Sequence, residues 1–333
     1  MQWIRGFAAA AVFFTGTSMA QAACVGSNVL DDLEQRDPEV YDGIFEMAAG
    51  VPNGEGRFWR VEHPGAPPSF LFGTFHTPQA VATVTPVIWS ELDSARIAIF
   101  EMSLDEQAAM EQRLATDPSF AFDFNAPPLS SRLSSEQLGI LSEALQTRGM
   151  SLQAAEQMRP WLLFTLLGFP ACHIQAIAEG GDPLDKEMAL RAGERDTPVM
   201  GLETYEEALG AFQRIRAERF LSMMVATGAM VADEEDVFRT NSDLYEDGHI
   251  AAINEFSIWL SEQQGVVSDS RALNTEIMAE ILDARNRAWM PDLVREMRKG
   301  RAFVGVGALH LPGREGLVEL LRARGFTVTR VDP

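Results

Sequence analysis

The sequence predicts an α/β protein whose sheet carries its functional groups at one edge. Short runs of β-branched and aromatic residues alternate with amphipathic helical segments, which is the pattern of βαβ units in a parallel sheet. Two longer stretches, about 104–180 and 205–299, show a helical pattern over most of their length. We therefore expect one domain over residues 23–333, in which these helical regions cover the sheet core.

The most informative segment lies near the C-terminus. Residues 302–307 form a short apolar run typical of a buried strand, and His310 follows just beyond its end. Gly307 lacks a side chain, so other groups can approach the strand end closely. A helical pattern over 317–321 and a strand pattern over 326–331 complete a βαβ unit. In such sheets, ligands bind beyond the carboxyl ends of the strands.

The same pattern occurs 234 positions earlier in the chain. Residues 69–73 form an apolar run that ends in Gly73, and His76 follows. Each histidine is followed by a proline, Pro78 or Pro312. The chain has only 5 histidines, so two copies of strand-Gly-x-x-His are its strongest internal signal.

An acidic residue ends the next strand along the chain. Thr85 and Pro86 have the cap and first-position chemistry of a helix start, and residues 96–102 then show a strand pattern with Glu101 near its end. Right-handed crossovers bring parallel strand ends to the same sheet edge, so we expect Glu101 near His76. The simpler alternative is a solvated glutamate at a strand end.

Further polar residues mark later elements. Asp185 lies in the first turn of a predicted helix, where a carboxylate is favourable. Glu203 ends another strand pattern and is either a site residue or a cap of the following helix. Arg285 and Asn286 lie on the helix before the last strand pair, facing either solvent or the site.

Composition and missing motifs narrow the functional classes. The chain has 48 acidic and 27 basic residues, a net charge of -21, which disfavours nucleic acid and anionic membrane surfaces as partners. It contains no Gly-x-Ser-x-Gly elbow, His-Glu-x-x-His helix, Walker loop or dinucleotide fingerprint. The sequence therefore does not predict the common hydrolase and nucleotide-binding sites.

Residues 1–22 have the pattern of an export signal, with Arg5 as the only charge, an apolar stretch and a small-x-small cleavage site. We expect a periplasmic or secreted protein without a transmembrane segment in the mature chain, since the apolar stretch is too short to span a bilayer. A lipid anchor on Cys24 is the weaker alternative, because Gln21 stands where a leucine is expected. In an oxidising compartment Cys24 and Cys172 could form a disulfide or remain unrelated thiols.

The residue types at the predicted sheet edge suit a metal site. His76, His310 and Glu101 would supply two imidazoles and a carboxylate to a divalent ion such as zinc, manganese or cobalt. Three protein ligands leave a position for a water that the metal acidifies. Glu203 or Asp185 would then act as general base. Alternatively, both imidazoles only hydrogen-bond loop backbone and stabilise the strand ends.

These motifs resemble the TraB/PrgY/GumN group, which includes the Tiki proteins. Together with the strand pair near Trp59, the matching segments cover nearly all of the mature chain. They are Phe72–His76, Phe100–Glu101, Arg159–Trp161, Gly201–Thr204, Arg285–Asn286 and Phe303–Gly313. The related erythromycin esterase and ChaN-like folds imply a mixed or mostly parallel α/β sheet with a large helical insertion.

The resemblance also implies roles for the residues in these motifs. In Tiki proteins the two Gly-x-x-His elements and the acid after the second strand support a metal-dependent protease, so His76, His310 and Glu101 carry over as metal-site residues. Other members of the matching motifs carry over as candidate catalytic residues without individual roles: Glu203, Asp185, Arg285 and Asn286.

The function expected from this combination is an exported metal-dependent hydrolase, acting on peptide bonds of a peptide or protein substrate. The alternative is a non-catalytic periplasmic protein that sequesters a peptide or haem, or that assists envelope polysaccharide assembly. Cleavage of a bound peptide would separate the two.

Overall fold

The computed structural model describes residues 24–77 and 83–331. The expected signal peptide, residues 1–22, lies outside the described residues. The described chain forms a mixed sheet with many helices, which confirms the predicted α/β fold with a helical insertion.

Six strands form the sheet, in the order β4-β3-β5-β2-β1-β6. They are β1 (Phe58–Glu62), β2 (Ser69–Thr74), β3 (Ile97–Phe100), β4 (Val199–Gly201), β5 (Ala302–Gly307) and β6 (Thr327–Arg330). The four strands from β4 to β2 are parallel, whereas β1 is antiparallel to both β2 and β6. The carboxyl ends of β2, β3, β4 and β5 therefore meet at one edge of the sheet.

Strand β5 lies inside the sheet, and its apolar sequence suits this buried position. All its residues are buried, and its side chains alternate between the two faces of the sheet. Phe303 belongs to the apolar cluster that includes Ile88 of helix α3 (Pro86–Asp93). Val304 belongs to the cluster on the other face, with Leu293 of helix α16 (Ala284–Met297). Helices thus cover both faces of β5.

Strand β5, helix α17 (Leu317–Arg322) and strand β6 follow one another along the chain in the predicted order, but β5 and β6 are not neighbours in the sheet. Strands β5 and β6 run in the same direction, but β2 and β1 lie between them in the sheet. Helix α17 makes the connection and packs on the same face as α16. The direct neighbours of β5 are therefore β2 and β3.

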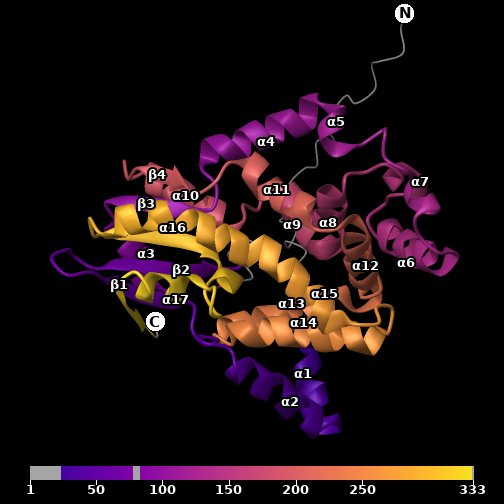
Figure 1. Ribbon diagram of the computed structural model, residues 1–333, viewed down its shortest axis with the longest axis horizontal. Coiled ribbons are helices and arrows are strands. Elements are labelled where there is room, and N and C mark those ends of the chain that lie inside the picture. Colours follow the sequence, from indigo (N-terminus) through magenta and orange to yellow (C-terminus); the bar gives the residue numbers. More distant parts are fainter. Residues whose placement is uncertain (1–23, 78–82, 332–333) are drawn as a thin grey trace, which may run out of the picture.

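Helices make up most of the remaining chain, as the patterns over about 104–180 and 205–299 predict. In Figure 1 the sheet lies at one end of the molecule, and α6, α7, α8 and α12 gather at the other end. The N-terminal half holds α1 (Val29–Arg36), α2 (Pro38–Ala49), α4 (Leu104–Thr116), α5 (Pro118–Ala121), η1 (Leu129–Ser131), α6 (Ser135–Gln146), α7 (Leu152–Ala155) and α8 (Pro160–Gly168). Then follow α9 (Ala171–Ala178), α10 (Leu184–Gly193), α11 (Tyr205–Arg214), α12 (Ala217–Gly228), η2 (Val231–Asp233), α13 (Glu234–Glu246), α14 (Ile250–Gln264) and α15 (Ser270–Met278). The π-helix η3 (Ala279–Asp283) joins α15 to α16, and the 3-10 turn η4 (Ala308–His310) follows β5.

Cys24 and Cys172 lie at bonding distance, with their Sγ atoms 2.08 Å apart and their Cα atoms 5.4 Å apart. The pair joins the start of the described chain to helix α9 across 148 residues. Of the two alternatives left open by the sequence, the structure therefore selects the disulfide.

Within the described residues, no single helix is both long and apolar enough to cross a membrane. Helices α8 and α9 meet these length and composition criteria only as a pair, and a 98° bend separates them. Trp161, Leu163 and Leu167 of α8 are buried in the protein.

Candidate functional site

The three residues predicted at the sheet edge lie together there. Glu101 directly follows β3, His76 lies two residues beyond β2, and His310 ends the turn η4 after β5. Because β3, β5 and β2 are adjacent and parallel, these positions converge. The expected proximity of Glu101 and His76 is confirmed, and His310 joins them.

Glu101 is the centre of the arrangement. Its Oε1 atom lies 3.8 Å from His76 Nε2 and 3.7 Å from His310 Nε2. The same oxygen accepts the backbone N–H of Gly307 at 2.8 Å, and Oε2 accepts from Arg285 Nη2 at 2.6 Å. Burial alone would raise the pKa of Glu101, but its interactions with Arg285, His310 and His76, together with the Gly307 N–H, hold that pKa well below its ordinary value. Glu101 is therefore a carboxylate.

Gly307 permits this close packing, as expected for a glycine at the strand end. A Cβ atom at this position would lie 2.8 Å from His76 Nε2 and 3.3 Å from Glu101 Oε1. The groups that approach the strand end are thus the candidate site residues themselves.

Helix α10 orients His76 through Asp185. The ring Nδ1 atom lies 2.8 Å from Asp185 Oδ2, and Asp185 Oδ1 also accepts from the Thr74 hydroxyl. Because Nδ1 donates to this carboxylate, Nε2 points toward Glu101. The Asp185 charge raises the pKa of His76 to about 9 against the opposing effect of burial. Without a metal, His76 is therefore an imidazolium at neutral pH.

Helix α16 orients His310 through Asn286. The Asn286 side-chain N–H groups donate to the carbonyls of His310 at 3.2 Å and Glu315 at 2.9 Å, which leaves its Oδ1 as an acceptor. That oxygen lies 2.7 Å from His310 Nδ1, so Nδ1 carries the proton and Nε2 presents a lone pair. Burial, with only 3% of the residue exposed, lowers the pKa of His310 to about 3. His310 is thus neutral, in contrast to His76.

Arg285 connects the two acidic residues that follow strands β3 and β4, Glu101 and Glu203. Its Nε atom donates to Glu203 at 3.0 Å and its Nη2 atom contacts Glu203 and Glu101. Its guanidinium lies over the Trp289 ring, 4.8 Å from the centroid, and Trp289 Nε1 donates to Glu203 at 3.1 Å. Burial disfavours the charged form of Arg285, but the two carboxylates raise its pKa above the ordinary value. Burial also disfavours the charged form of Glu203 and therefore raises the pKa of Glu203.

Glu203 is not the cap of the following helix. Thr204 caps α11, and Glu207 completes a capping box with it. The capping alternative is therefore wrong, and Glu203, with 5% of its side chain exposed, holds Arg285 instead.

The structure brings all seven predicted site residues into one assembly, which we call the strand-end cluster. Its members are His76, Glu101, Asp185, Glu203, Arg285, Asn286 and His310. Figure 1 shows their sources, which are the edge of the sheet and helices α10 and α16. Sequence reasoning missed Thr74 and Trp289. Trp289 carries a recognisable signal, because it lies one helical turn after Arg285 and thus on the same face.

The donors in the cluster match a divalent metal ion in kind. Two imidazole Nε2 atoms face one carboxylate oxygen, and each imidazole is oriented by a hydrogen bond at Nδ1, as in known metal sites. Within residues 24–77 and 83–331, however, no group of three or more His, Cys, Asp and Glu side chains is close enough to hold a metal as it stands. Arg285 Nη1 lies 3.3 Å from His310 Nε2 and provides a positive charge there. Metal binding would therefore require this guanidinium nitrogen to withdraw from His310 and His76 to release its proton.

Comparison with known proteins supports the resemblance seen in the motifs. A protein of Shigella flexneri named YbaP, described as uncharacterized, is 25% identical over 263 residues, which cover 78% of this chain and 89% of that protein. The YbaP protein of Escherichia coli strain K12, also described as uncharacterized, is 26% identical over 197 residues, or 58% and 68% of the two chains. The TraB/PrgY/gumN family pattern matches residues 57–330, which include the whole strand-end cluster. The chain therefore belongs to the TraB/PrgY/gumN family.

Proposed function

We propose that the protein is an exported metal-dependent hydrolase that cleaves peptide bonds. One observation carries the proposal: the Nε2 atoms of His76 and His310 both lie within 3.8 Å of the same oxygen of Glu101. Such a set of two imidazoles and one carboxylate is typical of catalytic sites for zinc, manganese or cobalt.

His76, His310 and Glu101 would hold the metal. When bound, the metal would supply Lewis-acid polarisation of a carbonyl and a water of lowered pKa. His310 already presents a neutral imidazole, whereas His76 must first lose its proton, so binding competes with protonation. Asp185 and Asn286 keep each ring turned so that Nε2 faces Glu101.

The two candidate bases are both engaged by hydrogen bonds, and we assign each a positioning role. Asp185 has 16% of its side chain exposed, but its Oδ2 atom pairs with His76 Nδ1 on the side of the ring away from Nε2, and its Oδ1 atom accepts from Thr74, so we propose that it positions His76. Glu203 has 5% exposed and both of its oxygens accept hydrogen bonds from Arg285 or Trp289. We therefore propose that Glu203 positions Arg285, which in turn positions Glu101.

Export and the peptide substrate rest on other observations. The signal-like segment 1–22 supports export, and the Cys24–Cys172 disulfide suits an oxidising compartment. The choice of a peptide bond follows from the resemblance to the Tiki proteins. A periplasmic or secreted location and a peptide substrate are accordingly parts of the proposal.

Metal binding tests the ligand assignment directly. The mature chain would be freed of metal by chelation and titrated with Zn²⁺, Mn²⁺ and Co²⁺ in a calorimeter. We expect one bound ion in the wild type, and affinity at least about 100-fold weaker in His76→Ala and in His310→Ala, since each loses a ligand. His249→Ala is the matched control, because His249 pairs with Glu55 outside the cluster. Unchanged stoichiometry and affinity in both cluster variants would reject the assignment.

Peptide cleavage separates the enzyme from the binding alternative. The metal-loaded protein would be incubated with a peptide library and the products identified by mass spectrometry. Cleavage that is lost in Glu101→Gln and reduced in Asp185→Asn would support the hydrolase. Retention of peptides without cleavage would favour a binding protein.

A further inference from the structure

Thr77, the residue after His76, is held from two sides. Its backbone carbonyl accepts the N–H of Leu184 at 2.9 Å, and its hydroxyl lies 3.2 Å from Nδ1 of His173. Leu184 begins α10 and directly precedes Asp185, the carboxylate that orients His76. Thr77 itself is buried, with 1% of the residue exposed. This threonine therefore connects His76 both to the start of α10 and to His173, which lies outside the strand-end cluster.

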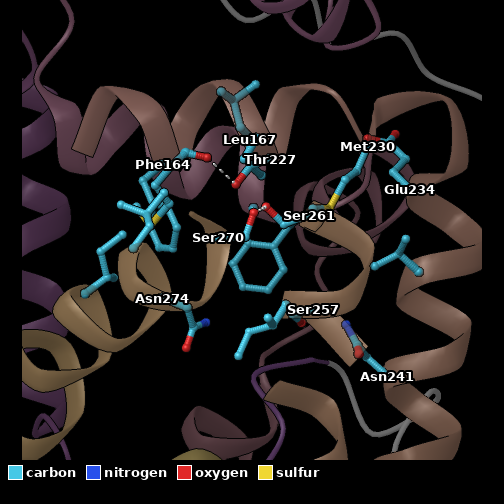
Figure 2. Close-up of a pocket in the computed structure, with 18 of the residues that line it drawn as sticks. Phe164, Leu167, Thr227, Met230, Glu234, Asn241, Ser257, Ser261, Ser270 and Asn274 are labelled. Atoms are coloured by element: carbon cyan, nitrogen blue, oxygen red, sulfur yellow. Dashed lines mark hydrogen bonds between the residues drawn. The ribbon is translucent and has the colours of Figure 1, made fainter. Parts of the chain in front are cut away.

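His173 lies in an enclosed position on α9. Only 2% of the residue is exposed, and its ring stacks on that of Phe169 with the centroids 4.5 Å apart. Phe169 and Phe238, a second ring near His173, also line a cavity of about 290 Å³ among the helices, which Figure 2 shows, but His173 does not line it. The Nε2 atom of His173 is buried without a hydrogen-bond partner among the described residues. Within the described chain, the Thr77 hydroxyl is therefore the group that bonds this imidazole.

The position and charge of His173 are both set by its surroundings. Cys172, the preceding residue, forms the disulfide with Cys24, which anchors the start of α9. Burial, aided by the charge of His76, lowers the pKa of His173 to about 4, so its ring is neutral at neutral pH. The hydrogen bond to Thr77 is thus made without burying a charge, which would be costly.

We propose that His173 is a positioning residue of the strand-end cluster, which holds His76 and the start of α10 together through Thr77. The inference rests on the proposed metal site, in which His76 is a ligand and Asp185 orients it. If Thr77 loses this support, His76 and Asp185 are no longer held against a common residue, and the hydrogen bond between them is weakened. The Nε2 atom of His76 is then less constrained to face Glu101.

Two variants of His173 separate positioning from packing. His173→Phe keeps a ring that stacks on Phe169 but loses the hydrogen bond to Thr77. His173→Asn loses the stacked ring, yet its side-chain amide can place an N–H or an oxygen near the Thr77 hydroxyl. If His173 acts through this hydrogen bond, the asparagine variant keeps the site and the phenylalanine variant does not, whichever of the two is more stable.

Hydrogen exchange of the Leu184 amide tests the contact in metal-free protein, measured by NMR on the full mature chain. This N–H donates to the Thr77 carbonyl, so its exchange rate reports how often that contact opens. We expect exchange about three- to tenfold faster in His173→Phe, the usual net effect of one hydrogen bond, and wild-type exchange in His173→Asn. Thr77→Val removes the hydroxyl and should match His173→Phe, and the double variant should exchange no faster than either single one.

The affinity for Zn²⁺ tests the consequence for the site. Calorimetric titration should give about three- to tenfold weaker binding in His173→Phe and Thr77→Val, and wild-type binding in His173→Asn. His249→Phe is the matched control, because it makes the same chemical change where the histidine pairs with Glu55 outside the cluster. This control should leave both the Leu184 exchange and the Zn²⁺ affinity unchanged.

The proposal is overturned if His173→Phe leaves either the Leu184 exchange or the Zn²⁺ affinity at the wild-type value, or if His173→Asn is impaired as much as His173→Phe. Should His173→Phe fail to fold, the same criteria apply to Thr77→Val, which keeps the shape of the side chain. If the wild type binds no metal, the proposed function fails, while the exchange comparison still decides whether His173 holds Thr77.

Discussion

Gly307→Ala tests whether the packing at the end of β5 sets the geometry of the site. The backbone of Gly307 has φ -50 and ψ 134, which any residue can adopt, so alanine adds no backbone strain. The added Cβ atom would lie 2.8 Å from His76 Nε2 and 3.3 Å from Glu101 Oε1. The substitution therefore acts on the site through one methyl group.

The size of the effect follows from which neighbour can move. Glu101 is held by Arg285 and the Gly307 N–H, whereas 49% of the His76 side chain is exposed and its ring can turn toward solvent. Overpacking of a protein interior costs about 1–3 kcal/mol of stability. Because the His76 ring can move, we expect a cost near the lower end of this range, which corresponds to a melting temperature lower by roughly 2–4 °C. Moving the ring removes a proposed ligand, so metal affinity should fall about 10- to 100-fold and cleavage at least as much.

Thermal unfolding, metal titration and peptide cleavage would be measured on Gly307→Ala and on a control, Gly139→Ala. Gly139 lies within helix α6 and has no atom within 4 Å of its added Cβ. This control should gain about 0.5–1 kcal/mol of stability and keep its metal affinity. If folded Gly307→Ala protein binds metal and cleaves peptides like the wild type, the space at Gly307 does not determine the position of the His76 ring.

Two further predictions concern stability. Cys172→Ser removes the disulfide with Cys24 and should lower the free energy of unfolding by about 2–4 kcal/mol. Urea denaturation should show this as a lower midpoint concentration. Equal urea midpoints of the wild type with and without reductant would contradict the prediction. Lys299, followed by Arg295 and Arg96, lowers the pKa of Glu296 to about 2 against the effect of burial. The folded state therefore binds fewer protons than the unfolded state, and this stabilisation is present above about pH 4.5 and lost toward pH 2. Glu296→Gln should reduce the loss of stability over that range, and an unchanged acid profile would argue against the assignment.

The sequence was sufficient to place the strand-end residues because their positions depend on local pattern. A buried strand, a glycine and a histidine locate His76 and His310 at strand ends, and parallel crossovers bring those ends to one edge. Glu101 follows from the same rule. No side-chain contact had to be known for these three expectations.

The orientation of the side chains could not be predicted in the same way. Asp185 contacts His76 from 109 residues away, and this depends on how α10 packs against the sheet. Arg285 and Asn286 are adjacent in sequence, yet one binds carboxylates and the other fixes the His310 ring. A π-helix precedes α16, and periodicity in the sequence does not reveal such a change of winding.

The position of Arg285 links the metal proposal to the electrostatics of the cluster. Glu101 and Glu203 are two largely buried carboxylates that share this one guanidinium, and removing one partner of a buried ion pair typically costs about 3–5 kcal/mol. A divalent ion held by Glu101 would replace the charge that Arg285 now provides to that residue. Arg285 would still have Glu203, to which it donates from both Nε and Nη2. Metal entry and the withdrawal of Arg285 from His310 are therefore compatible, because neither carboxylate is left without a positive partner.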